Sequence, residues 1–169
     1  MDIKQLRDIQ GPLKEKYKQN PQTALINIRA EGIIEGHDIS CRILKNIETD
    51  IAGLHPAAGG DGSKACSAEI LMESLVACAG VTMKAVATAM RLEITHTKVI
   101  AECVWDARGT LGVDREAPVG LSNVNLTFEF QNSADPEKLE RLVQLTERYC
   151  VIFQTLANPP KLVSRYKVV

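Results

Sequence analysis

Residues Ser67–Met90 read SAEILMESLVACAGVTMKAVATAM, and this least polar long stretch of the chain decides its fold. Apolar side chains occupy nearly every side of a helix drawn through it, which is typical of a helix that is buried all round. Small residues on either side of Cys78 would let another backbone approach closely. Since a chain of 169 residues offers little protein to surround such a helix, we expect a partner subunit to complete its burial.

The composition narrows the class of protein. A length of 169 residues favours one domain, and a hydrophobic content of 45% can supply a core. Lys and Arg number 20 against 21 Asp and Glu, so no basic field indicates a nucleic-acid partner. Residues 1–17 are charged throughout, and Glu69, Glu73 and Lys84 interrupt the apolar run, so we expect neither a signal peptide nor a membrane span. A cytoplasmic protein is the expectation.

The order of the other segments predicts an α+β fold. Residues 2–20 indicate an amphipathic helix, and residues 23–48 indicate an antiparallel hairpin that turns near Glu35 and Gly36. A glycine-rich loop then leads to the apolar helix, with Ser67 as its expected N-cap. The later elements are two long strands, a helix with Asp135 as its N-cap, and a closing strand; they span residues 95–109, 122–132, 135–157 and 161–169.

Cys78 lies near the middle of the apolar helix and has two open interpretations. A buried free cysteine is most often an inert packing residue. A reactive cysteine must form a thiolate, but apolar burial raises the pKa of a thiol. Cys78 lies about three turns from the start of its helix, too far for the helix dipole to lower that pKa. A reactive Cys78 therefore requires a cation from elsewhere in the fold.

The remaining cysteines do not form a metal motif. The chain has five cysteines, without a CxxC pair or a Cys/His cluster at zinc spacing, so no metal site is predicted. In a reducing compartment they are expected to be free thiols. They are Cys41, Cys66, Cys78, Cys103 and Cys150.

Two cysteine motifs resemble the OsmC/Ohr family. Residues 67–87, SAEILMESLVACAGVTMKAVA, are similar to the central-helix motif that carries the peroxide-reacting cysteine of that family. Residues 147–157, ERYCVIFQTLA, are similar to its second-cysteine motif, at the junction of two C-terminal helices. The flanking stretches AAGGDGS and DARGTLGVDREAPVGLSNVNLTFEF also fit. The similarity covers residues 23–169, which form the family-like core of a single domain over 1–169, while residues 1–22 form an N-terminal helical segment.

This resemblance implies a fold and an activity. The fold has antiparallel sheets around a long buried central helix, in an intertwined homodimer with active sites at the subunit interface. The activity is reduction of organic hydroperoxides in oxidative-stress defence, with Cys78 as the peroxidatic thiolate and Cys150 as the resolving thiol. A dithiol reductant, a lipoylated protein in the best-known branch, would reduce the resulting disulfide. No metal or organic cofactor is required.

The resemblance also indicates which residue would be the cation that a reactive Cys78 requires. Family members use an arginine from an N-terminal strand, held by a glutamate; Arg29 is the best match here and Arg42 is the alternative. Ala68 stands where the glutamate is expected, so Glu69, one residue later, or Glu73 would take its place.

Two further features depart from the family pattern. Val151 follows Cys150 where relatives usually have proline, and Cys66 is an additional thiol. The departures at Ala68 and Val151 motivate an alternative function, a non-catalytic dimer that binds a small apolar ligand at the subunit interface.

Overall fold

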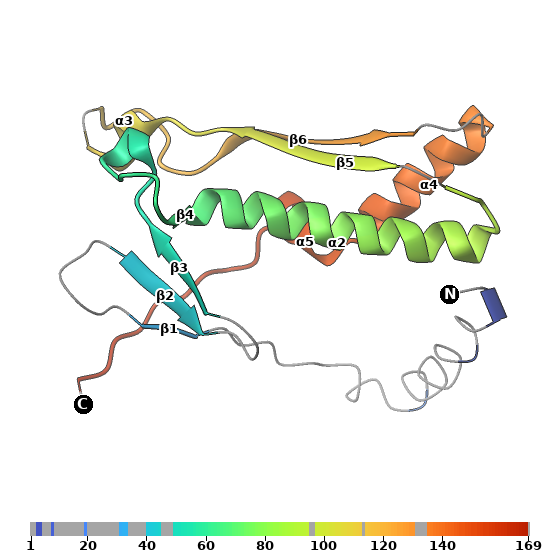
Figure 1. Cartoon of the computed structure of the whole chain (residues 1–169), viewed down its shortest axis with the longest axis horizontal. Helices are drawn as coiled ribbons and strands as arrows, with labels where there is room; N and C mark the ends of the chain where they lie inside the picture. Colours follow the sequence, from blue (N-terminus) through green and yellow to red (C-terminus); the bar gives the residue numbers. More distant parts are fainter. Residues whose placement is uncertain are drawn as a thin grey trace. The chain divides into compact units, whose positions relative to one another are not determined.

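The computed structural model describes residues 51–94, 97–112, 114–130 and 135–168, although not the side chain of Arg108 (Figure 1). It describes the backbone alone of the strands at 31–33, 40–44 and 49–50, and single helical residues at 3, 4, 8 and 19. These residues divide into two compact units, Met1–Glu73 with Ile100–Thr127, and Ser74–Val99 with Phe128–Val169. A single domain over residues 1–169 stays a prediction.

The first unit contains a four-stranded sheet in the order β1-β2-β3-β4. The predicted hairpin is confirmed, because β1 and β2 pair antiparallel with Ile33 opposite Arg42. β3 was not predicted, since its sequence TDIAG shows no alternation of apolar and polar residues; it pairs antiparallel with β2. β4 pairs parallel with β3, and this pairing fixes the residue that precedes the long helix. The strands are β1 Glu31–Ile33, β2 Ser40–Leu44, β3 Thr49–Gly53 and β4 Ala65–Cys66.

The glycine-rich segment between β3 and β4 is a loop, as predicted, with one 3-10 turn, η2, at Pro56–Ala58. The turn closes at Gly59, whose φ of 93° is the left-handed conformation that glycine adopts readily. A side chain at Gly60 would overlap the carbonyl group of Leu54. The loop is therefore held close against the end of β3.

The two predicted long strands are β5, Lys98–Val104, and β6, Ser122–Glu129, which form a separate two-stranded sheet. Residues alternate between half-buried and exposed along the second half of β6, as its sequence pattern predicts. The turn-rich connection between the strands contains a short helix, α3, at Ala107–Thr110.

The apolar stretch forms one helix, α2, over Ser67–Met90. Ser67 is its first helical residue and not its N-cap; instead, the backbone N–H of Cys66 donates to Oε2 of Glu69 at 3.3 Å, the geometry of half a capping box. Its buried residues recur every three or four positions as one stripe: Met72, Leu75, Ala79, Met83 and Ala87. Val81, at 74% exposed, lies off that stripe. By length and composition α2 could cross a membrane, a property shared with core helices of other proteins.

The predicted C-terminal helix is interrupted. α4 spans Pro136–Tyr149 and begins as predicted, with Oδ1 of Asp135 accepting from the N–H of Glu137 at 3.1 Å. α5 spans Val151–Ala157, and Cys150 between the two helices is extended, with φ −75° and ψ 111°. The periodic pattern wrongly predicted one helix over 135–157, because the side-chain periodicity continues across the break. The resemblance correctly predicted a junction at Cys150.

The core of the second unit joins α2 to α4. Met83, Ala87 and Ile94 form a buried cluster with Leu142 of α4, and Phe128 packs against this cluster. Thr146 and Cys150 continue the buried face of α4 at four-residue spacing, so the same packing carries Cys150 inward.

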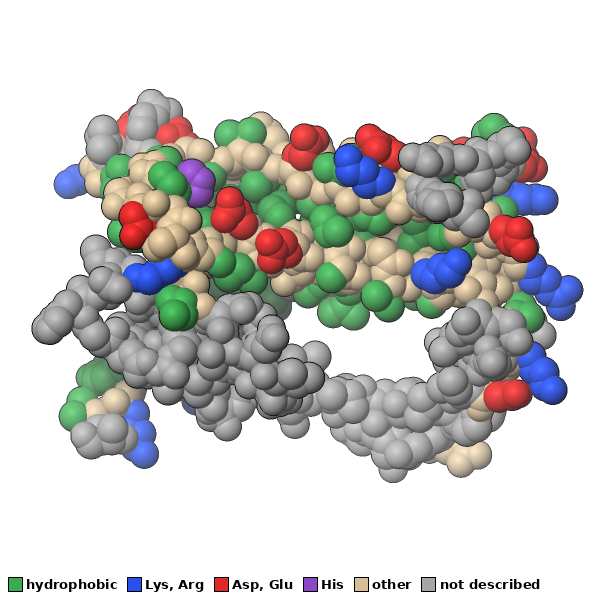
Figure 2. Space-filling view, viewed as in Figure 1, with side chains coloured by type: hydrophobic (Ala, Val, Ile, Leu, Met, Phe, Trp, Pro, Cys, Tyr) green, Lys and Arg blue, Asp and Glu red, His purple; other side chains and the backbone are tan. Residues whose placement is uncertain are grey.

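The predicted closing strand is wrong for residues 161–168, which have no regular secondary structure. A strand needs a partner for its ladder of hydrogen bonds, and no described strand of this chain pairs with the segment. Leu162 and Tyr166 are 88% and 94% exposed. Apolar and basic side chains stand at the surface of the C-terminal segment, at the lower left of Figure 2.

Candidate active site

The structure brings together two of the predicted site residues, Cys78 and Cys150. Cys78 lies in the part of α2 that belongs to the second unit, and Cys150 lies in the same unit at the junction of α4 and α5. Their thiols are hydrogen-bonded to each other, and both cysteines are free. Two thiols in contact are already placed for a disulfide bond to form between them.

Donors that point at Cys78 stabilise its thiolate. Burial raises the pKa of Cys78, but the backbone N–H of Ile152, the Cys150 thiol, the N–H of Val151 and the Thr82 hydroxyl all donate to the sulfur. Together these hydrogen bonds hold the pKa of Cys78 below that of an ordinary thiol. Cys78 is therefore the member of the pair that ionises first.

The pKa of Cys150 is shifted in the opposite direction. Cys150 is 0% exposed, and burial raises the pKa of its thiol, against the N–H of Phe153, which lowers it. The hydrogen bond to Cys78 and the negative charge on that neighbour raise the pKa of Cys150 further. The environments of the two sulfurs separate their roles, with a thiolate at Cys78 beside a protonated Cys150.

The first turn of α5 is the feature that the sequence analysis missed. Cys78 is too far from the start of its own helix for that helix to act on it, but the backbone N–H groups of Val151 and Ile152 donate to its sulfur from α5. The predicted cation, from Arg29 or Arg42, stays a prediction. Val151 contributes an N–H that a proline at this position would lack. The departure from the family pattern thus adds a donor at the sulfur.

A hollow of about 440 Å³ adjoins Cys150 and Val151. The guanidinium of Arg148 lies 5.7 Å from the centroid of the Tyr149 ring, and both residues line this hollow. Cys78 is not among the residues that line this hollow.

The other predicted site residues lie elsewhere or outside the described residues. Arg29 is outside them, and only the backbone of Arg42, in β2, is described. Glu69 is exposed and accepts from the N–H of Cys66, so it caps the start of α2. Glu73 is exposed in the single chain, and its role in orienting an arginine stays a prediction. Within the described part of the chain, no three His, Cys, Asp or Glu residues cluster as metal ligands.

Comparisons with known proteins agree with this fold. A family model described as OsmC-like protein matches residues 60–165 of the chain. No curated protein matches the sequence significantly. Among solved structures, an OsmC like protein from Mycoplasma pneumoniae is 16% identical, with 79% of this chain and 89% of that chain covered and a TM-score of 0.66.

Two other solved structures have the same fold. An organic hydroperoxide resistance protein OsmC and predicted redox protein from Legionella pneumophila is 15% identical, with 79% of this chain and 91% of that chain covered and a TM-score of 0.62. An OsmC-like protein of unknown function from Vibrio cholerae is 12% identical, with 78% and 94% covered and a TM-score of 0.62. At these identities the likeness establishes the α+β OsmC-like fold alone.

Proposed function

Because this chain belongs to the OsmC-like protein family, we propose that it is a cysteine-based peroxidase that reduces organic hydroperoxides to alcohols. The observation that carries the proposal is the contact between a thiol of lowered pKa, Cys78, and a buried thiol of raised pKa, Cys150. Names of structural relatives such as the Legionella pneumophila protein agree with hydroperoxide chemistry.

The reaction proceeds in three balanced steps. The Cys78 thiolate attacks the terminal peroxide oxygen, the O–O bond breaks, and the alkoxide takes up a proton and leaves as the alcohol. Cys78 is now a sulfenic acid; the sulfur of Cys150 attacks it, a disulfide forms and water leaves. An external dithiol then reduces the disulfide by two exchanges, becoming a disulfide itself.

The α5 amides serve this chemistry because they are fixed backbone groups. They stabilise the negative charge on Cys78 before peroxide arrives and need no rearrangement during the reaction. Cys150 keeps its proton until Cys78 has been oxidised, so it does not compete for peroxide. The hollow beside Cys150 suits the approach of a small dithiol or a lipoylated protein arm.

An arginine remains part of the proposal. Arg29, or Arg42 in its place, would add a permanent positive charge and several donors for the peroxide oxygens. Glu69 or Glu73 would orient that arginine. Both carboxylates are exposed in the single chain, which leaves them accessible to a second subunit.

We further propose that the protein is a homodimer that acts in the cytoplasm, where the thiols stay reduced. Apolar side chains lie at the surface of α2 and α5, among them Val81 at 74% and Val151 at 65% exposed. The extended segment at 161–168 exposes Leu162 and Tyr166 and lacks a strand partner among the described residues. A second copy would cover these surfaces.

The direct test measures consumption of cumene hydroperoxide by purified protein with dithiothreitol as the reductant. Wild-type protein should turn over, and Cys78→Ser should fall to the uncatalysed rate because no thiolate remains to attack the peroxide. Cys103→Ser, a half-buried cysteine in β5 outside the site, is the matched control and should retain the activity. A rate in Cys78→Ser equal to that of wild type would refute the proposal and favour the non-catalytic ligand-binding alternative.

A further inference from the structure

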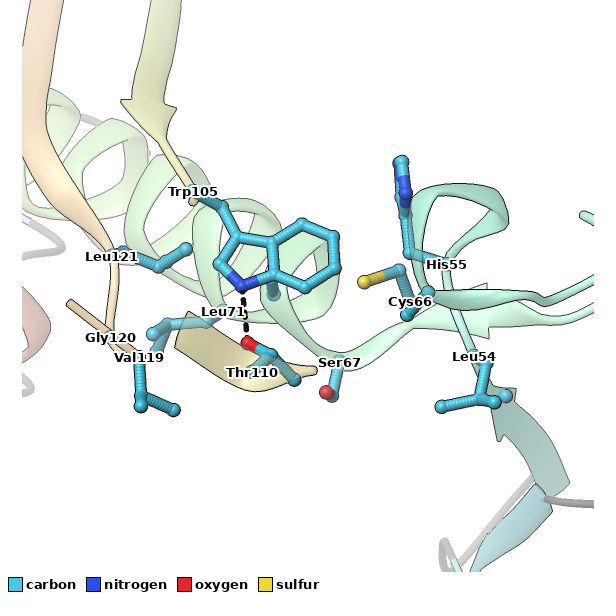
Figure 3. Close-up of a pocket in the computed structure, with 13 residues that line it drawn as sticks. Leu54, His55, Cys66, Ser67, Leu71, Trp105, Thr110, Val119, Gly120 and Leu121 are labelled. Atoms are coloured by element: carbon cyan, nitrogen blue, oxygen red, sulfur yellow. Dashed lines mark hydrogen bonds between the residues drawn. The ribbon is translucent and has the colours of Figure 1, made fainter. Parts of the chain in front are cut away.

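A second hollow, of about 470 Å³, lies wholly in the first compact unit and includes neither Cys78 nor Cys150 in its lining (Figure 3). Its walls come from the end of β3 and the loop after it, the start of α2, the segment around Trp105, and the residues just before β6. This volume is within the range of small-molecule sites in proteins. We call this hollow the Trp105 pocket.

The aromatic wall of the Trp105 pocket is held in place before any ligand arrives. Nε1–H of Trp105 donates to Oγ1 of Thr110 at 2.9 Å. The His55 ring meets the indole edge to face, at 5.4 Å between centroids and 80° between planes. His55 is itself fixed, because its Nδ1 accepts from the N–H of Ala57 at 3.0 Å. A wall whose side chains are already ordered loses little entropy when it binds a ligand.

The rest of the lining selects against charge. Among the described residues that line the pocket there is no Asp, Glu, Lys or Arg. Leu54, Leu71 and Leu121 supply apolar surface, and the hydroxyl of Ser67 and the thiol of Cys66 supply polar atoms. The Cys66 sulfur points toward the space between Trp105 and His55 (Figure 3). A charged ligand would lose its hydration here without gaining an ionic partner.

We propose that the Trp105 pocket is a binding site for a small uncharged organic molecule with a planar aromatic or conjugated part. The planar part would pack against the indole, and one polar atom would face Cys66 or Ser67. The pocket contains neither Cys78 nor Cys150, so ligand binding there can be tested separately from the peroxidase reaction.

Trp105 is the chain's single tryptophan, so its fluorescence reports directly on the pocket. The probe is N-phenyl-1-naphthylamine, an uncharged aromatic fluorophore that accepts energy from excited indole. Titration of the full chain should quench Trp105 and sensitise the probe saturably, with one probe bound per chain. Cys78→Ser should bind the probe as wild type does, which separates this test from that of the peroxidase.

Probe binding by a variant in the pocket wall and by a matched control shows whether the probe binds in the Trp105 pocket. Val119 lines the pocket yet is 64% exposed, so Val119→Asp adds a charge to the wall with little disturbance of the fold. It should weaken binding at least tenfold. Leu111→Asp, at an exposed apolar residue outside the lining, should bind as wild type does.

A second readout needs no variant. Bound probe should slow alkylation of Cys66 by iodoacetamide severalfold and leave Cys103, which is not in the lining, unaffected. Quenching that never saturates, equal binding by Val119→Asp, or unchanged alkylation of Cys66 would each overturn the proposal.

Discussion

Cys78 and Cys150 differ in what surrounds each sulfur, although the two are in contact. Cys78 receives hydrogen bonds from the Val151 and Ile152 amides and from Thr82. Cys150 also receives hydrogen bonds from backbone amides, those of Phe153 and Ile152, but its burial and the charge of its neighbour outweigh them and raise its pKa. The surroundings therefore assign the nucleophile and the resolving thiol within the proposed reaction. The same type of residue serves both roles because the local fields differ.

This difference predicts distinct pH profiles for alkylation by iodoacetamide. Only the thiolate reacts, and its fraction grows as the pH rises through the pKa. Since the pKa of Cys78 is lowered and that of Cys150 raised, Cys78 should become reactive at lower pH than free cysteine and Cys150 at higher pH. Peptide mass spectrometry after timed alkylation of the wild-type protein measures the alkylation of Cys78 and of Cys150 separately. A Cys78 profile at or above that of free cysteine would contradict the assignment.

At the scale of elements, the break between α4 and α5 creates the site. An unbroken helix would use the N–H groups of residues 151 and 152 in its own hydrogen bonds, and none would be available for Cys78. The extended conformation of Cys150 frees them. The β-branched residues Val151 and Ile152, and Phe153 after them, favour the helix less than the residues of α4 do.

Val151→Pro tests the contribution of the first α5 amide. Proline is accepted at the first position of a helix but has no N–H, so the substitution removes one donor from Cys78 and should keep the fold. The pKa of Cys78 should rise, and alkylation at neutral pH should slow roughly tenfold, the loss of one hydrogen bond to a charged group. Val151→Ala keeps the N–H and is the control; equal slowing in both variants would assign the effect to the lost side chain instead.

Much of this arrangement could be predicted from residues that act locally. Asp135 and Pro136 fixed the start of α4, and the alternation in residues 122–130 predicted β6. The short strand β3 and the irregular segment at 161–168 were not predicted, because their conformations depend on which strands are available to pair. The two motifs predicted which two cysteines form the site. The α5 backbone N–H groups that donate to Cys78 could not be predicted, because their position depends on tertiary packing and not on the spacing of residues in the sequence.

For the whole molecule, exposed apolar side chains are the observation behind the proposed homodimer. Much of α2 outside its buried stripe is apolar. The segment at 161–168 contains both apolar and basic residues and has no strand partner among the described residues. Surfaces of this kind mark protein interfaces. In the proposed homodimer they would also bring the exposed carboxylates of Glu69 and Glu73 to the partner.

Leu162→Asp combined with Tyr166→Asp should weaken this dimer. Both side chains are almost fully exposed in the single chain, so the substitutions leave its core unchanged. They destabilise the dimer only if its interface buries these two positions, because each new carboxylate would then lose its hydration. Size-exclusion chromatography with light scattering should show the mass of a monomer, while Lys167→Glu, a charge change without loss of apolar area, should remain a dimer. An unchanged mass in the double variant would place the interface elsewhere.

Disulfide mapping can establish whether Cys78 and Cys150 act as one redox pair. Reduced wild-type protein is treated with one equivalent of cumene hydroperoxide, the remaining thiols are alkylated, and non-reduced peptides are analysed by mass spectrometry. We predict a single new crosslink between the Cys78 and Cys150 peptides, with Cys66 and Cys103 alkylated. Unoxidised Cys78, or a disulfide from Cys78 to Cys66 in place of Cys150, would contradict the account.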